Sequence, residues 1–296
     1  MPNKISSFIK LLRVKQWVKN AFILFPIIFS GQLYNLQRWG VCFLTFAGFC
    51  LISSGIYILN DFLDRKQDRL HPKKSRRPLA QKVFNTPTVF VMILTILTGG
   101  LWLCHLADDL ILYTAGIYII LHLVYNYYTK KIVILDVIFV AAGFQIRVWA
   151  GSFAAGVLPS IWLQLCVFLL ALFLGFTKRR HEISTLRDHA PDHRSVLAHY
   201  TTYLLDQIII ICSTLTIVFY GLYTISPEII ARVGNHNMVY SIGFVTYGIF
   251  RYLYLVHVKK TGDDPGEVLL SDKALIVNIL LWVTYVILIL YFSRPV

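Results

Sequence analysis

The sequence predicts an all-α membrane protein in which nine transmembrane helices cross the bilayer. The 296-residue chain is 57% hydrophobic and 15% charged, with a mean hydropathy of +0.64, which is far more apolar than a soluble domain of this size requires. Apolar runs of bilayer-spanning length recur along the whole chain. Basic residues, moreover, gather in every second segment between these runs, as expected for loops that face the cytoplasm.

Nine apolar segments are expected to span the membrane, and the first of them is short and interrupted by Pro26. In order they cover residues 20–34, 39–59, 86–106, 109–128, 132–153, 159–177, 203–224, 239–258 and 274–292. Residues 3–19 precede them. There, Ile5, Phe8, Ile9 and Leu12 recur at helical spacing among basic residues, which predicts an amphipathic helix lying in the membrane interface.

The distribution of charge predicts the orientation of the chain. If the N-terminus is cytoplasmic, 23 of the 28 Lys and Arg residues fall in cytoplasmic segments, and only Arg38, Arg232 and Arg294 fall outside. The net charge of +13 therefore does not indicate nucleic acid, because its sources are spread over five segments of one membrane face. We expect one domain over residues 1–296, whose function resides in the cytoplasmic segments 60–85 and 178–202.

The five cysteines lie inside apolar runs and form no CxxC pair, so they are expected to be small buried hydrophobic residues. Neither a disulfide framework nor a zinc site is indicated. The N-terminal segment lacks the pattern of a signal peptide and is expected to be retained.

An acidic motif follows the second predicted span. Asn60, Asp64 and Asp68 recur every four residues and Asp61 precedes Asp64 by three, so on a helix all four would face one side. Carboxylates held so close require a cation, and Mg²⁺ accepts one or two carboxylates together with phosphate oxygens. The basic residues that follow provide donors for such phosphates, with Lys74, Arg76 and Arg77 as the candidates. A pyrophosphate site is favoured over a purely orienting loop, since orientation needs no acidic residues.

A second polar cluster closes the sixth span. Its candidate substrate-binding residues are Lys178, Arg179, Glu182, Arg194 and Tyr200, and the alternative is a basic anchoring loop. Asp136 and Arg147 share one face of the fifth span, where ionisable residues usually line a polar cavity or form an ion pair between helices. Of these two, Asp136 is the better site candidate.

Further candidates for substrate binding lie at the edges of other spans. They are Lys15, Lys19 and Asn20, where the amphipathic helix meets the first span, and Tyr127 at the end of the fourth span. An anchoring role at the interface is the alternative for the first group.

Taken together, these motifs resemble the UbiA prenyltransferase superfamily. The resemblance is carried by Asn-Asp-x-x-Asp-x-x-x-Asp at 60–68 after a second span. The run Arg13–Asn20, the extension 71–78, the cluster 178–182 and the late segment 263–270 are more narrowly similar to its polyprenyl-phosphate phosphoribosyltransferase branch, which includes decaprenyl-phosphate enzymes. The resemblance covers nearly the whole chain.

This resemblance implies a UbiA-type bundle of nine helices in the plasma membrane, with a polar cavity that faces the cytoplasm and opens laterally to lipid. It also implies Mg²⁺-dependent transfer of 5-phosphoribose from 5-phosphoribosyl-1-pyrophosphate to a polyprenyl phosphate, with Asn60, Asp61, Asp64 and Asp68 as metal ligands. The chain departs from the superfamily in its second acidic motif, so whether Asp188, Asp192 or Glu182 binds a second metal is left open.

Two alternatives remain at this point. A prenyltransferase of the same fold would move a prenyl group from a lipid pyrophosphate to an aromatic acceptor. A transporter would use Asp136 and Arg147 as a coupling pair, but the sequence lacks evident inverted halves. The sequence leaves open the polyprenyl length, the glycoconjugate made downstream and whether the protein forms a homo-oligomer.

Overall fold

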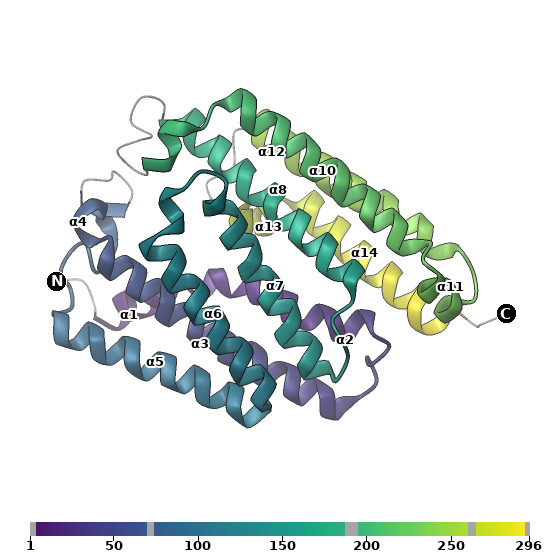
Figure 1. Ribbon diagram of the computed structural model, residues 1–296, viewed down its shortest axis with the longest axis horizontal. Helices are drawn as coiled ribbons and strands as arrows, with labels where there is room; N and C mark the ends of the chain where they lie inside the picture. The colour runs from purple at the N-terminus through teal and green to yellow at the C-terminus, as the bar shows by residue number, and fades with distance from the viewer. Residues whose placement is uncertain (1–3, 70–73, 187–194, 260–264, 294–296) are drawn as a thin grey trace. The chain divides into compact units, whose positions relative to one another are not determined.

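The computed structural model describes residues 4–69, 74–186, 195–259 and 265–293, and this part of the chain is helical without any β-strand. Figure 1 shows the α helices in their order along the chain, and the 3₁₀ helices between them are denoted η here. By length and composition, eight helical segments within the described residues can cross a membrane. They are α3 (Leu36–Leu63), α5 (Thr86–Ala107), α6 (Asp109–Tyr127), α7 (Leu135–Ala155), α8 (Ile161–Leu186), α10 (Thr202–Thr224), η6 (Asn237–Ser241) continued by α12 (Ile242–His257), and α14 (Lys273–Phe292).

These eight correspond to eight of the predicted spans, and the all-α membrane fold is confirmed. The predicted first span, 20–34, is not one long helix. Its residues belong to the end of η1 (Val14–Leu24), to α2 (Phe25–Phe29) and to the turn that follows. The count of nine crossings and the orientation of the chain therefore stay predictions.

The predicted amphipathic segment 3–19 is divided in two. Helix α1 (Lys4–Leu12) buries Ser7 and Leu11 and leaves Ile5 and Ile9 exposed. It ends at Arg13, whose φ of 50° lies in the left-handed region, where a non-glycine residue cannot continue a right-handed helix. The chain then resumes as η1.

The helices form two compact units, which are described separately. The first comprises residues 1–27, 35–130 and 146–158. Its central element is α3, which packs against α5, η1, α1 and α6. An apolar cluster joins α1, α3 and α5, and its buried members are Leu11, Ile58, Phe62, Leu79, Val89, Ile93 and Ile96.

Helices α3 and α5 approach so closely that their backbones nearly touch. A methyl group on Gly100 would lie 2.7 Å from Ile52 Cγ1 and 2.8 Å from the Gly48 carbonyl oxygen. A methyl group on Gly48 would lie 2.7 Å from Cys104 Sγ. Small residues allow this approach between membrane helices, where dispersion contacts rather than water exclusion hold helices together. The close packing fixes α3, which carries the acidic motif at its end.

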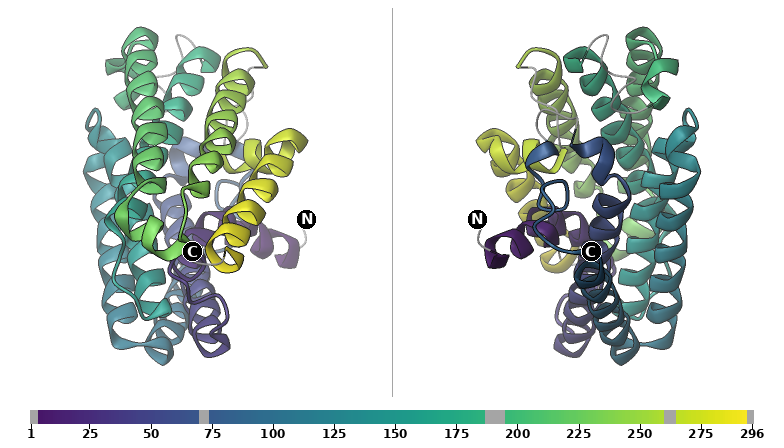
Figure 2. Two further views of the ribbon diagram at one scale, coloured as in Figure 1. Left: turned by 90° about the vertical axis from the view of Figure 1, so that its right-hand side faces the viewer. Right: turned by 90° about the vertical axis from the view of Figure 1, so that its left-hand side faces the viewer.

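The second unit comprises residues 28–34, 131–145 and 159–296. Within it α10 packs against α8 and α12, and α12 packs against α14; Figure 2 shows α10 and α12 among these neighbouring helices. Its core is largely aromatic and branched, with Phe173 and Tyr252 in edge contact at 5.5 Å between ring centroids. The shorter elements of this unit are η5 (Ser195–His199), α11 (Pro227–Val233) and α13 (Pro265–Ser271).

Candidate functional site

Two carboxylates of the acidic motif converge on one arginine. Helix α3 ends at Leu63, and the short helix α4 (Arg65–Asp68) follows. Arg77 donates from the same nitrogen, Nη1, to Asp61 Oδ1 at 2.9 Å and to Asp68 Oδ2 at 2.8 Å. Both carboxylates are buried, with side chains 4% and 6% exposed, whereas the arginine is 27% exposed. Arg77 Nη1 thus lies between two buried carboxylates.

A second arginine reaches the same position from the N-terminal segment. Arg13 Nη2 donates to Asp61 Oδ1 at 2.5 Å, and its guanidinium lies 5.1 Å from the centre of the Tyr57 ring. The left-handed backbone at Arg13, between α1 and η1, brings the chain past the end of α3. Asp61 therefore receives two charge-assisted hydrogen bonds on one oxygen.

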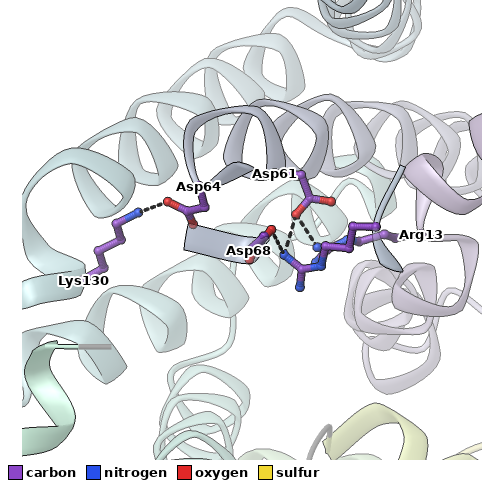
Figure 3. A network of polar contacts seen from close by, with 6 residues as sticks. Arg13, Asp61, Asp64, Asp68 and Lys130 are labelled. Carbon is purple, nitrogen blue, oxygen red and sulfur yellow. Dashed lines mark hydrogen bonds and ion pairs between the residues drawn. The ribbon is translucent and has the colours of Figure 1, made fainter. Parts of the chain in front are cut away.

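Asp64 has a different partner. Its Oδ1 accepts a hydrogen bond of 3.0 Å from Lys130 Nζ, beyond the end of α6, and Figure 3 shows it directed away from the carboxylates of Asp61 and Asp68. The prediction that four residues share one helical face is therefore wrong for Asp64, because it assumed a continuous helix. Asp64 caps α3 with φ −85° and ψ 0°, and this break separates its direction from that of Asp68. Asn60, in the last turn of α3, is half-buried.

The donor set fits a divalent cation in part. No group of three His, Cys, Asp or Glu side chains in the described residues is arranged to hold a metal ion. The two oxygens of Asp61 and Asp68 do lie within 3 Å of one cationic nitrogen. Mg²⁺ is commonly held by one or two carboxylates and completes its shell with water and substrate phosphates. The pair therefore provides the protein ligands that a substrate-bound magnesium ion needs.

The candidates at the start of η1 differ in their surroundings. Lys15 is exposed and Lys19 is half-buried, whereas Asn20 is fully buried. Asn20 Oδ1 accepts a hydrogen bond of 2.6 Å from Arg147 Nε, and its Nδ2 donates to Cys50 Sγ at 3.2 Å. These contacts give Asn20 a structural role, tying η1 to α3 and α7.

Arg147 is itself buried in this unit. Its Nη2 donates to the hydroxyl of Tyr118 at 2.5 Å, and its guanidinium lies 4.7 Å from the centre of that ring. Arg147 thus contacts the side-chain amide oxygen of Asn20 and both the ring face and the hydroxyl of Tyr118. These contacts distribute its buried positive charge.

The second unit contains a separate buried ion pair. Asp136, in the first turn of α7, is completely buried. Its carboxylate accepts a hydrogen bond of 2.6 Å from Arg179 Nε and one of 2.8 Å from the Tyr200 hydroxyl. Arg179 Nη1 also donates to Glu182 Oε2 at 2.8 Å. Burial and the hydrogen bond to Asp136 raise the pKa of Tyr200, so its hydroxyl stays protonated and donates to the carboxylate. Lys178 is half-buried beside this group.

Other candidates have less structural context. Arg76 and Tyr127 are exposed. Arg194, Asp188 and Asp192 lie outside the described residues, as does the side chain of Lys74. No role for these residues follows from their surroundings, and each stays a prediction.

Two cations at the site were not among the sequence candidates. Arg13 enters the sequence prediction only through orientation and the run 13–20, and Lys130 only through orientation, yet they contact Asp61 and Asp64. Their contacts join residues 48 and 66 positions apart. The one available signal was their charge at a predicted span boundary, which many anchoring residues share.

Comparison with known proteins gives consistent results. Residues 23–279 match the sequence model of the UbiA prenyltransferase family. A protein of Corynebacterium glutamicum named decaprenyl-phosphate phosphoribosyltransferase is 32% identical, over 98% of this chain and 88% of its own length. A protein of the same name from Mycolicibacterium smegmatis is 27% identical, over 98% of this chain and 94% of its own.

Among solved structures, a UbiA homologue from Archaeoglobus fulgidus bound to GPP and Mg²⁺ has the same fold. Its TM-score is 0.70 at 16% sequence identity, covering 96% of this chain and 99% of the other. The agreement covers nearly all of both chains, which confirms the predicted fold.

Proposed function

Because the chain belongs to the UbiA prenyltransferase family, we propose that it transfers 5-phosphoribose from 5-phosphoribosyl-1-pyrophosphate to a polyprenyl phosphate, releasing pyrophosphate. Full-length similarity to two proteins named decaprenyl-phosphate phosphoribosyltransferases supports this choice of substrates. The prenyltransferase reading, in which the acceptor is aromatic, fits the family only at a coarser level.

One structural observation carries the proposal. Arg77 Nη1 occupies the position between Asp61 and Asp68, and Arg13 reaches Asp61 beside it. Two carboxylates suit a magnesium ion that also binds phosphate oxygens, and two arginines suit the phosphates themselves. The site therefore matches a magnesium pyrophosphate group, which the proposed donor carries.

In the proposed reaction, the bond between ribose C1 and the pyrophosphate oxygen breaks and a bond forms between C1 and an oxygen of the lipid phosphate. The acceptor is already anionic at pH 7, so no side chain has to remove a proton. Asp61 and Asp68 would hold Mg²⁺, which neutralises charge on the departing pyrophosphate. With Mg²⁺ in the place that Arg77 Nη1 now occupies, Arg13 and Arg77 would bind phosphate oxygens, while Lys130 pairs with Asp64. The protein contributes chiefly position and charge.

The remaining predicted residues are assigned within this proposal by their charge. Lys15, Lys19, Lys74 and Arg76 would provide further cations for a donor that carries a 5-phosphate in addition to its pyrophosphate. Asp136, Lys178, Arg179, Glu182, Arg194 and Tyr200 stay predicted substrate-binding residues, and variants of each test that role. The charge asymmetry supports a site facing the cytoplasm, and the family resemblance implies the plasma membrane.

The proposal is tested with purified protein, Mg²⁺, 5-phosphoribosyl-1-pyrophosphate labelled in the ribose, and a panel of polyprenyl phosphates. We expect label to enter the organic phase only when donor, acceptor and Mg²⁺ are all present. A parallel reaction contains a prenyl pyrophosphate and 4-hydroxybenzoate. Prenylated product there, with no labelled lipid in the first reaction, would reject phosphoribosyl transfer in favour of aromatic prenylation.

A further inference from the structure

Two buried polar side-chain atoms, one in the last turn of α6 and one just beyond it, have no hydrogen-bond partner in the described part of the chain. They are Asn126 Nδ2 and Thr129 Oγ1. Each residue is 6% exposed. Other threonines of this unit behave differently: Thr114 donates to the Leu110 carbonyl oxygen at 2.7 Å, the usual local partner of a helical threonine. Buried donors left unpaired are uncommon in folded proteins and indicate a missing partner.

These two residues are close in the chain to one residue of the site described above. Asn126 is in the last turn of α6, and Thr129 directly precedes Lys130 in the short 3₁₀ helix η3 (Thr129–Lys131) that follows. Lys130 in turn donates to Asp64 at 3.0 Å, an ion pair visible at the left of Figure 3. Helix α6 also packs against α3, which carries the acidic motif. The unpaired amide and hydroxyl therefore belong to the segment that supplies Lys130 to the proposed donor site.

We propose that Asn126 and Thr129 hydrogen-bond the sugar hydroxyl groups of the donor and thereby select a phosphorylated pentose over a prenyl pyrophosphate. This inference rests on the proposed function. Amide and hydroxyl groups are neutral, and they match hydroxyl groups that both donate and accept. Phosphate oxygens are matched by the neighbouring arginines and lysine instead. A hydrocarbon chain would leave both side chains unpaired, so the site discriminates against it.

The test uses substitutions that retain shape and remove the polar atoms, Asn126→Leu and Thr129→Val, in the full chain purified in detergent. Calorimetry gives the Kd of 5-phosphoribosyl-1-pyrophosphate and, separately, of inorganic pyrophosphate, both with Mg²⁺. We expect each variant to bind the sugar donor at least tenfold more weakly and to bind pyrophosphate within twofold of the unsubstituted protein. Thr129→Ser, which retains the hydroxyl, should bind both normally, as should Tyr128→Phe at a side chain that is 70% exposed.

Two results would overturn the inference. Unchanged affinity for the sugar donor would mean that ordered water satisfies the two side chains. An equal loss for both ligands would mean a phosphate contact or a folding defect, and the melting temperature of each variant separates these two causes. Failure of the proposed function looks different, because the unsubstituted protein would then bind pyrophosphate but not the sugar donor, and the inference would fall with it.

Discussion

Asp61 and Asp68 share one guanidinium nitrogen, although the helix that carries Asp61 ends between them. If magnesium binds there with its phosphate ligand, Asp61→Asn or Asp68→Asn removes half of the negative charge that holds it. We expect kcat/KM for phosphoribosyl transfer to fall roughly a hundredfold, about 2.7 kcal/mol, and half-maximal activity to require more Mg²⁺. Steady-state rates across a Mg²⁺ titration measure both effects.

The matched control for these variants is Asp109→Asn. Asp109 lies in the same unit, in the first turn of α6, but its side chain is 72% exposed and its partner is His105. Its substitution should leave both rate and Mg²⁺ requirement unchanged. Full activity in Asp61→Asn and Asp68→Asn at the ordinary Mg²⁺ concentration would contradict a metal role for the pair.

Arg77 allows a prediction about stability. Substituting it with Ala leaves two buried carboxylates near one another with one fewer cation, and removing one partner of a buried pair typically costs about 3 kcal/mol. We expect Arg77→Ala to melt at a lower temperature without Mg²⁺ and to recover more than the unsubstituted protein when Mg²⁺ is added. Melting curves in detergent with and without Mg²⁺ measure this, and the exposed Lys66→Ala is the control. Equal recovery in all three proteins would show that no cation replaces the arginine.

The sequence predicted the acidic motif but not the geometry of its side chains. Residue type and spacing identify Asp61, Asp64 and Asp68, because four-residue spacing and carboxylate chemistry are local properties. The break at Asp64 depends on a backbone turn, and the contacts with Arg13 and Lys130 depend on the packing of distant segments. Pairing between residues 48 or 66 positions apart has no local pattern in the chain.

At the level of helices, the contact between α3 and α5 makes a specific prediction. Gly100→Ala places a methyl group 2.8 Å from the Gly48 carbonyl oxygen, which is backbone and cannot turn aside. Overpacking of this kind costs about 1–3 kcal/mol, so we expect a lower melting temperature in detergent. Gly116→Ala on α6 is the control, since a methyl group there meets nothing within 4 Å, and alanine favours helix. An equally stable Gly100→Ala protein would show that the two helices separate readily.

Helix positions were largely predictable, and helix type at the N-terminal end was not. Polar capping residues mark the boundaries of apolar runs, and the predicted span 86–106 corresponds to α5. Its N-cap is Asn85, whose side-chain oxygen accepts a hydrogen bond of 3.0 Å from the backbone nitrogen of Thr88. Hydropathy contains no comparable signal for η1. Its 3₁₀ geometry accompanies contacts such as Trp17 Nε1 to Ser54 Oγ at 3.0 Å, which form only when α3 is already in place.

For the whole molecule, the contacts of η1 bear on the number of membrane crossings. Arg13 lies near Asp61, Trp17 near Ser54 and Asn20 near Cys50, so η1 runs antiparallel to α3. The chain then returns to Asn35, the N-cap at the opposite end of α3. A 3₁₀ helix rises about 2.0 Å per residue, so the 11 residues of η1 cover roughly 22 Å. If α3 crosses the membrane, the segment from Arg13 to Asn35 must cross beside it.

A crossing by this segment brings the number of crossings to nine, so the two ends of the chain are predicted to lie on opposite sides of the membrane. The basic N-terminal segment predicts that Met1 is on the cytoplasmic side. Eight crossings would place both ends on the same side. An epitope tag before Met1 should be digested by protease in inside-out vesicles and protected in intact spheroplasts, and a tag after Val296 should behave in the opposite way. A soluble cytoplasmic marker verifies that each preparation is sealed. Equal accessibility of the two tags would exclude a crossing by residues 14–35 and leave α3 as the first span.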